Sequence, residues 1–332
     1  MNNPLHYPWV ELRQHSHAPT LAGHFRIMRL DHWIKNVFVL PGIVIAIAFT
    51  QVPLTTQVAL NIVLGILAVG LVTSSNYVLN EILDSPYDRW HPSKKSRPVP
   101  GGQVNIPVGG LQWMALFAAG ALLARAVNVQ LFYLLTLLWI MGCIYNVPPL
   151  RSKEWPYLDV ISEAVNNPIR LMAGWYMVDG ATWPPGSLLA AYWMVGCYFM
   201  AIKRFSELVN LSDDERASMG KYRTSFQYYT PTRLLISIVF YGSASMLFLG
   251  VFIMRYRMEL ILSFPLIALV MAQYLNIGFK PDSSAQNPEK LYKEFGLMVT
   301  LAACSILIVC LFFMDIPWIH DFFAPSFPYM AN

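Results

Sequence analysis

The sequence has few charged residues for its length. Of its 332 residues only 13% are Asp, Glu, Lys or Arg, whereas 56% are hydrophobic. Soluble domains carry about 25% charged residues, so this shortage argues against an ordinary soluble domain. The alternating apolar and polar pattern of a membrane β-barrel is also absent. The remaining fold class is an all-α integral membrane protein.

Cysteine and several enzyme signatures are also scarce. The four cysteines lie inside apolar stretches and form no CxxC pair, so they indicate neither a disulfide framework nor a cysteine zinc site. The motifs GxxxxGK[ST], HExxH and GxSxG are missing, so P-loop ATP hydrolysis, zinc proteolysis and serine acyl transfer lack their signatures. No aromatic platform accompanies the basic residues, and we expect no nucleic-acid partner.

Long apolar stretches are abundant. A transmembrane helix needs about 20 mostly apolar residues, and nine such stretches occur, at roughly 34–53, 58–82, 108–127, 130–147, 157–177, 187–208, 234–254, 259–279 and 295–314. We predict a polar N-terminal tail without a signal peptide (1–30), one transmembrane domain (31–315) and a C-terminal tail (316–332). We expect the catalytic loop in the polar connection at about 83–107.

Lys and Arg are concentrated in alternate connections. The opposite set of loops carries only Arg125, Arg255 and Arg257. By the positive-inside rule, this asymmetry predicts a cytoplasmic N-terminus and an external C-terminus.

Polar side chains mark the end of the second apolar stretch. Asn76, Asn80 and Asp84 recur every four residues, so they share one helix face. Pro86 disfavours further helix, which predicts Asp88 in the turn beyond. Carboxylate and carboxamide oxygens suit Mg²⁺, whose coordination is usually completed by water and substrate phosphates. The spacing therefore indicates a magnesium site.

Cations follow these acids at once and would neutralise such phosphates: Arg89, His91, Lys94, Lys95 and Arg97. The alternative is a solvated loop whose cations obey the positive-inside rule and pair with the acids. Ionisable groups at a helix end that faces a bundle interior are costly and usually functional, which favours the site.

A second acidic pair lies in LDVISEAVNNPIR, residues 158–170. Asp159 and Glu163 are one turn apart, and Asn166, Asn167 and Arg170 continue near that face. The alternative is a buried ion pair between Glu163 and Arg170. Two acidic clusters are thus predicted in the same leaflet.

Further cations lie near membrane depth: Lys35, Arg151, Lys153, Lys203 and Arg204, with Glu207 one turn beyond Lys203. Any single one is compatible with snorkelling to the interface. The whole set exceeds what one diphosphate requires and favours a ligand set with several phosphates.

These motifs resemble the UbiA superfamily of intramembrane prenyltransferases. The stretch NEILDSPYDRWHPSKKSRP, residues 80–98, is most similar to the decaprenyl-phosphate phosphoribosyltransferase branch, whose pattern is NDxxDxxxDxxHPxKxxRP. WIKN at 33–36, YNVPPLRSK at 145–153 and KRFSEL at 203–208 also resemble that branch. Glu81 stands where the branch usually has Asp, and Glu163 is closer to the wider superfamily.

The resemblance implies a nine-helix UbiA-like bundle with a polar cavity facing the cytoplasm, in the inner membrane of a prokaryote. It implies transfer of 5-phosphoribose from phosphoribosyl diphosphate to a polyprenyl phosphate, with Mg²⁺ held by Asn80, Glu81, Asp84 and Asp88. Asp84, Asp88 and Asp159 would be the catalytic carboxylates, and a homo-oligomer is compatible with it. The implied substrate contacts are Lys35, Asn36, Arg89, His91, Lys94, Lys95, Arg97, Tyr145, Arg151, Lys153, Glu163, Arg170, Lys203, Arg204 and Glu207.

Two other functions stay open. An aromatic prenyltransferase would keep the fold and the metal but would ionise a prenyl diphosphate, and Glu163 favours it. A transporter would use the acids as coupling sites, but broken helices in inverted halves at mid-membrane would be needed.

Overall fold

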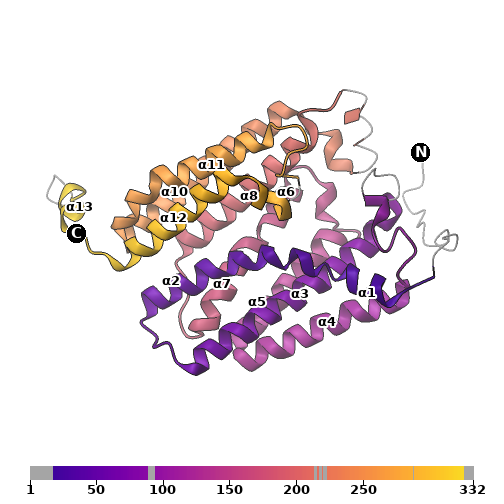
Figure 1. Cartoon of the computed structure of the whole chain (residues 1–332), viewed down its shortest axis with the longest axis horizontal. Coiled ribbons are helices and arrows are strands. Elements are labelled where there is room, and N and C mark those ends of the chain that lie inside the picture. The colour runs from indigo at the N-terminus through magenta and orange to yellow at the C-terminus, as the bar shows by residue number, and fades with distance from the viewer. Residues whose placement is uncertain are drawn as a thin grey trace. The chain divides into compact units, whose positions relative to one another are not determined.

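The computed structural model describes residues 18–88, 94–212, 215, 216, 219, 223–286 and 288–324, with the backbone alone for Lys94, Pro288 and Glu289. Within these ranges the chain is helical and contains no β-strand (Figure 1). The predicted all-α fold class is confirmed. The chain divides into two compact units. Residues 1–43, 54–181 and 212–229 form the first, and residues 44–53, 182–211 and 230–332 form the second.

The first unit contains most of the predicted polar motifs. Its α-helices are α1 (Leu21–Ile27), the first residues of α2 (Leu40–Thr50), α3 (Thr56–Asp88), α4 (Ile106–Val127), α5 (Val129–Asn146), α6 (Leu158–Ala164) and α7 (Asn166–Val178). Its 3-10 helices are η2 (Leu30–Val39), η3 (Lys94–Ser96), η4 (Ser152–Glu154) and η5 (Thr224–Gln227). The long helix α3 packs against α4, α5 and α7.

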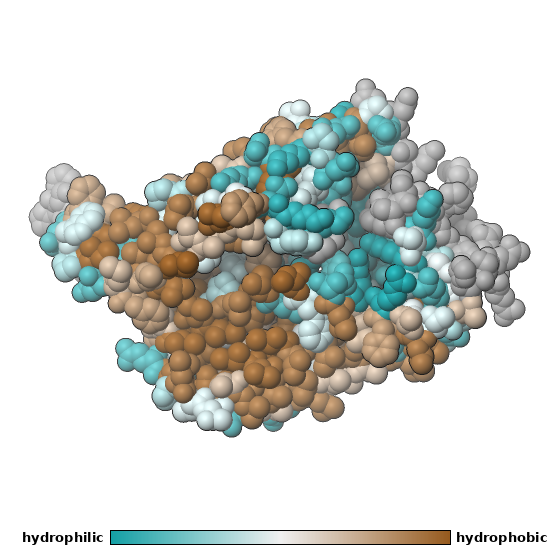
Figure 2. Space-filling model, in the orientation of Figure 1, coloured by the Kyte–Doolittle hydropathy of each residue, from teal (hydrophilic) through white to brown (hydrophobic). Residues whose placement is uncertain are grey.

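The second unit is built from longer apolar helices. Its elements are the remainder of α2, α8 (Gly186–Leu208), α10 (Pro231–Tyr256), η6 (Met258–Ser263), α11 (Phe264–Gly278), η7 (Pro288–Lys293), α12 (Phe295–Phe313) and α13 (Pro317–Phe322). Helix α10 packs along α8, and α11 packs against α12. Apolar residues cover broad areas of the visible surface, as expected for helices in contact with lipid (Figure 2).

Local sequence explains where several helices begin. The side chain of Asn105 accepts a hydrogen bond from the Val108 N–H at the start of α4, and Asn128 does the same for Leu131 at the start of α5. Thr230 caps α10, whose first residue is a proline. These are the residue types that satisfy the free N–H groups of a first helical turn.

Eight of the described helical segments are long and apolar enough to cross a membrane. The predicted count of nine is therefore not confirmed. The difference lies in the predicted fifth stretch, 157–177, which forms two short helices, α6 and α7, on either side of Val165. Hydropathy gives the length of an apolar stretch but does not register a break of one residue.

Helix α3 continues further than predicted. Pro86 lies inside its last turn, and the helix reaches Asp88. The prediction that Pro86 ends the helix and leaves Asp88 in a turn was wrong. Proline removes one backbone donor, but a single missing bond so near the end leaves the helix intact when tertiary contacts hold it. The buried Asp88 side chain supplies such a contact, as described below.

Two glycines let helix backbones touch within the first unit. A Cβ atom on Gly42 would lie 1.9 Å from the Leu171 carbonyl oxygen, and one on Gly174 would lie 2.1 Å from the Val39 carbonyl oxygen. The start of α2 and the middle of α7 therefore pack at a distance that only glycine permits, as small residues do in membrane helices.

Candidate functional site

Asp84, near the end of α3, lies at the centre of the site. Its Oδ1 accepts hydrogen bonds from Lys153 Nζ and from Arg151 Nη2, the latter at 3.1 Å. Only 7% of Asp84 is exposed. The carboxylate thus balances two cations that are more than 60 residues away in the chain, because η4 folds onto the end of α3.

Lys153 is held among polar atoms although it is almost completely buried, with 1% exposed. Its ammonium also donates to Asn146 Oδ1 at 2.8 Å, and the same oxygen accepts from Asn80 Nδ2 at 2.6 Å. The ring of Tyr145 lies 5.9 Å from Nζ. Burial lowers the pKa of the Lys153 ammonium to about 8, against the attraction of Asp84, which raises it.

Arg151 connects η4 to α3. Its guanidinium lies over the Tyr87 ring at 5.0 Å and its Nε donates to Glu154 Oε1 at 3.1 Å. Arg151 has a positive φ of 29°, an unusual backbone conformation for a residue with a side chain. Burial of Glu154 opposes ionisation, but hydrogen bonds from the Thr224 N–H and from Arg151 outweigh it and lower the pKa of that carboxyl.

The connection after α3 is tied back to the same helix. Asp88, with no exposed surface, pairs with Arg97 at 2.6 Å. Glu81 is also buried, and its Oε1 accepts a hydrogen bond from the Val99 N–H at 3.0 Å. Asp88 and Glu81 therefore fix residues 97–99 against α3.

The second acidic motif meets a segment that comes much later in the chain. Asp159, fully buried in α6, accepts a hydrogen bond from the Tyr229 hydroxyl and lies 3.9 Å from Arg223 Nη1. The Tyr229 oxygen in turn accepts from the Tyr157 N–H at 2.6 Å. These contacts anchor residues 223–229 beside η4 and α6.

A small charged pocket joins these groups. It has a volume of only about 10 Å³ and is lined by Asp84, Tyr87, Arg151, Lys153, Glu154 and Arg223. Three of the six residues are cations and two are acids. The pocket has room for about one water molecule, because the lining side chains form ion pairs with one another.

Other predicted residues of the first unit lie outside that pocket. Lys35 contacts His32 Nδ1 at 2.8 Å, and His32 packs on the ring of Tyr77. Asn36 is buried, whereas Lys95 is exposed in η3.

The break between α6 and α7 leaves Glu163 in α6 and Asn166, Asn167 and Arg170 in α7. Within the described residues no ion pair joins Glu163 to Arg170, so that alternative is not supported. The Oδ1 of Asn166 and the Nε of Arg170 are buried and form no hydrogen bond in the described part of the chain.

Three predicted residues belong to the second unit. Lys203, Arg204 and Glu207 lie near the end of α8, where Arg204 pairs with Glu207 at 2.9 Å. Arg89 and His91 are outside the described residues, as is the side chain of Lys94.

Four contributors were not singled out from the sequence: Tyr87, Asn146, Arg223 and Tyr229. Asn146 adjoins Tyr145 in the YNVPPLRSK motif, so its place was readable. Arg223 and Tyr229 fall in a polar connection with several other cations and tyrosines, and no spacing distinguishes them.

The donors at the end of α3 fit a hard divalent cation. Asn80, Asp84 and Asp88 offer a carboxamide and two carboxylates, the ligand types that Mg²⁺ takes. Both carboxylates are buried and already balance positive charge. The Glu81 carboxylate, by contrast, holds the Val99 backbone.

Helices long enough to span a membrane, with a cluster of acids and cations at the end of one of them, place a polar site at the end of a membrane helix. The model of the UbiA prenyltransferase family matches residues 36–301. The chain therefore belongs to this family and is a UbiA-type intramembrane prenyltransferase.

Two curated relatives illustrate the sequence similarity. The decaprenyl-phosphate phosphoribosyltransferase of Mycolicibacterium smegmatis is 31% identical over 219 residues, which are 64% of this chain and 64% of that protein. The nodulation protein NoeC of Azorhizobium caulinodans is 28% identical over 229 residues, 68% of this chain and 69% of that protein. The match thus spans about two thirds of the length of these relatives.

Solved structures show the same fold. A UbiA homolog from Archaeoglobus fulgidus bound to GPP and Mg²⁺ has a TM-score of 0.64 and 20% identity, covering 86% of this chain and 99% of that one. A UbiA homolog from Aeropyrum pernix has a TM-score of 0.58 and 16% identity, covering 82% and 97%. At this identity the likeness concerns the fold alone.

Proposed function

We propose that the protein transfers 5-phosphoribose from phosphoribosyl diphosphate to a polyprenyl phosphate and releases diphosphate. The observation that carries the proposal is the convergence of three cations, Arg151, Lys153 and Arg223, with Asp84 in one pocket. Arg97 adds a fourth cation at Asp88. The relatives named as decaprenyl-phosphate phosphoribosyltransferases support it.

This cation set suits substrates with several phosphates. The donor carries a diphosphate and a 5-phosphate, and the acceptor carries one more phosphate. Buried or half-buried cations bind phosphate strongly because little water screens them, and Arg binds it through two parallel hydrogen bonds.

The reaction breaks the bond between the anomeric carbon and the diphosphate oxygen and forms a bond from that carbon to an oxygen of the lipid phosphate. Negative charge grows on the departing diphosphate, and Lys153 and Arg151 would stabilise it, whereas Arg97 would contact a donor phosphate both before and during the reaction. Asn80, Asp84 and Asp88 would hold Mg²⁺, which would supply further stabilisation of phosphate charge. The lipid phosphate is already ionised, so no strong base is required.

The ion pairs of the site place each cation beside a carboxylate that is a candidate metal ligand. Lys153 and Arg151 now neutralise Asp84, and Arg97 neutralises Asp88. Asp84 and Asp88 would hold the metal ion, and the cations beside them would then contact phosphate oxygens. The charge stays balanced before and after binding, which lowers the cost of burying it.

In this proposal Asp159 does not contact the substrate but holds Tyr229 and Arg223 in place. Its carboxylate holds Tyr229 and lies beside Arg223, so it would position that guanidinium at the pocket. We therefore propose Asp159 as a positioning residue.

The loop charges predict the orientation of the chain in the membrane. We propose the inner membrane of a prokaryote, with the N-terminus and the acid-bearing end of α3 toward the cytoplasm and the C-terminus outside. The soluble donor then enters from the cytoplasm and the lipid acceptor from the bilayer.

Prenyl transfer to an aromatic acceptor is the second candidate. The half-buried Glu163, one turn from Asp159 on α6, favours it because a second acidic pair can hold a second metal.

A paired assay tests the proposal. Purified protein in lipid with Mg²⁺ receives phosphoribosyl diphosphate with polyprenyl phosphate, or polyprenyl diphosphate with a hydroxybenzoate. We expect lipid-linked phosphoribose and released diphosphate in the first reaction. A prenylated ring in the second reaction alone would overturn the proposal.

The Asp84→Asn variant is the control for the site. We expect it to remain folded by size-exclusion chromatography and to lose turnover, whereas Asp282→Asn in an exposed turn retains both. Near-normal turnover of Asp84→Asn in saturating Mg²⁺ would exclude Asp84 as a metal ligand.

A further inference from the structure

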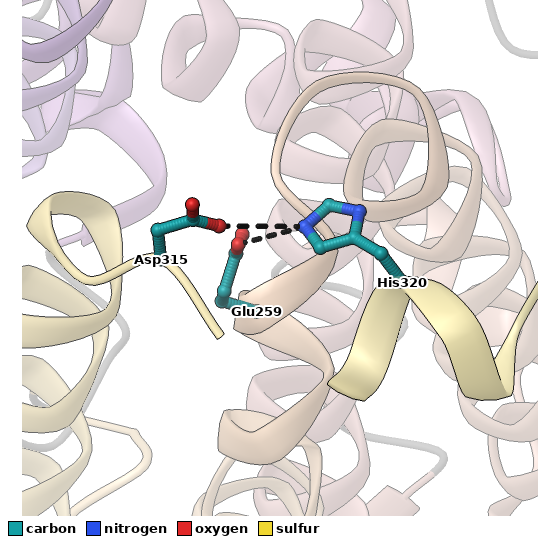
Figure 3. Close-up of side chains that lie close together, drawn as sticks. All are labelled: Glu259, Asp315 and His320. Carbon is teal, nitrogen blue, oxygen red and sulfur yellow. Dashed lines mark hydrogen bonds and ion pairs between the residues drawn. The ribbon is translucent and has the colours of Figure 1, made fainter. Parts of the chain in front are cut away.

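Three side chains with metal-binding atoms gather in the second unit, where α10 ends and the last helix begins. Glu259 lies in η6, directly after α10. Asp315 follows the end of α12, and His320 lies in the short helix α13, which packs against η6 (Figure 3).

The geometry of the three groups suits a shared ion. His320 Nε2 lies 3.0 Å from Glu259 Oε1 and 3.8 Å from Asp315 Oδ1. One ligand atom from each residue lies within 4.8 Å of the others. Two ligands of a tetrahedral zinc ion, each about 2.0–2.1 Å from it, are about 3.3 Å apart. The two measured separations fall on either side of that value.

Glu259 provides a second, independent observation. Its side chain is only 1% exposed, and its Oε2 is a buried atom that accepts no hydrogen bond from the described residues. Arg257 Nε lies 3.3 Å from this oxygen as an ion pair, but the guanidinium donates its hydrogen bonds to the carbonyls of Leu311 and Met314. The Glu259 Oε2 charge is thus balanced by Arg257, but the oxygen accepts no hydrogen bond, which leaves its lone pairs open to a metal ion.

We infer that Glu259, Asp315 and His320 bind a divalent cation of the zinc class. One imidazole nitrogen and two carboxylate oxygens form a borderline ligand set that zinc accepts, with water in the fourth position. Two carboxylates and one guanidinium leave a net charge of about −1 at neutral imidazole, which a dication reverses to about +1.

The ion would join the C-terminal helix to the rest of the second unit. Helix α13 has only six residues and packs on η6, so few contacts hold it. A metal bridging His320 to the buried Glu259 would fix it, as structural metal sites do in small elements.

Zinc binding to the full-length chain tests the inference. The protein is treated with a chelator, returned to buffer without chelator, and dialysed against limiting Zn²⁺ before the bound metal is measured by mass spectrometry. We expect His320→Gln to lose one bound zinc relative to the parent chain. His24→Gln, whose imidazole contacts Gln112 in the first unit, is the matched control and should keep it.

The N-terminal tail requires its own control, since His15 and His17 can also bind zinc. A His15→Gln, His17→Gln double variant should retain the zinc that His320→Gln loses. Equal zinc in the parent and His320→Gln chains, or loss of that zinc in the tail variant alone, would overturn the inference.

Protection from proteolysis is a second readout that does not require measuring the amount of bound metal. Asp315 is exposed, so Asp315→Asn should leave the fold intact while weakening zinc binding. Zinc should slow chymotrypsin cleavage after Phe322 and Phe323 in the parent chain and have no such effect in Asp315→Asn. Cleavage that is equally fast with and without zinc in the parent chain would also overturn it.

Discussion

At the scale of single residues, the most informative side chain is Lys153. It is a buried cation whose partners, Asp84 and Asn146, come from two different helices. An ion pair in a water-poor site contributes little net stability, but removing one partner leaves an uncompensated charge that is expensive. Lys153 is therefore expected to matter for folding as well as for phosphate binding.

Replacing this lysine tests the pairing. Lys153→Met should lower the free energy of unfolding by about 1–3 kcal/mol, because Asp84 loses one of its two cationic partners and keeps only Arg151. Lys290→Met, at an exposed position, should change it little. The measurement is unfolding in detergent followed by tryptophan fluorescence.

The double variant Lys153→Met, Asp84→Asn separates the effect of breaking the ion pair from the effect of changing the side-chain volume. Removing both charges should restore most of the lost stability without restoring turnover. Strictly additive destabilisation would show that the two groups do not interact.

Arg97 is the second residue with a distinct expectation. It pairs with the buried Asp88 and belongs to the connection that follows α3. Arg97→Ala should mainly raise the apparent KM for the diphosphate donor, because a phosphate contact is lost while the reacting groups stay in place. Steady-state kinetics with varied donor measure this, and Arg26→Ala at an exposed position is the control. A fall in kcat at unchanged KM would contradict it.

At the scale of helices, the close approach of α2 and α7 is a sharp constraint. Gly174→Val would drive a side chain into the Val39 carbonyl, where a Cβ alone would already lie at 2.1 Å. We expect destabilisation of about 1–3 kcal/mol or more, as for overpacking. Gly110→Val is the control, because no atom lies within 4 Å of its added Cβ. Thermal unfolding of both variants is the measurement, and equal midpoints would refute the constraint.

The same scale shows what the sequence could predict. Spans such as α3 and α10 were readable because apolar length and capping residues mark them locally. The break at Val165 and the passage of α3 through Pro86 were not, since both depend on tertiary contacts. Asp84 stood out through its four-residue spacing. Its pairing with Arg151 and Lys153 did not, because no local pattern connects residues so far apart.

At the scale of the whole molecule, the loop charges predict an orientation. Reporter cysteines are placed in a chain whose four native cysteines are replaced: Lys290→Cys lies in a connection predicted to be cytoplasmic, and Ala181→Cys lies in one predicted to be external. In intact cells an impermeant maleimide should label position 181 and not position 290. In permeabilised cells both positions should be labelled. Labelling of position 290 and not of position 181 in intact cells would show that the chain has the opposite orientation.

The path of the chain through its two units sets the order in which the pocket is completed during synthesis. Asp84, Arg151 and Lys153 are made early, but Arg223 and Tyr229 follow α8, a helix of the other unit. A ribosome must therefore translate about two thirds of the message before the last cation of the pocket and the tyrosine that bonds to Asp159 emerge. Since chains begin to fold from the N-terminus as they are made, the first unit's helices can pack early. Its pocket closes only after α8 has been translated.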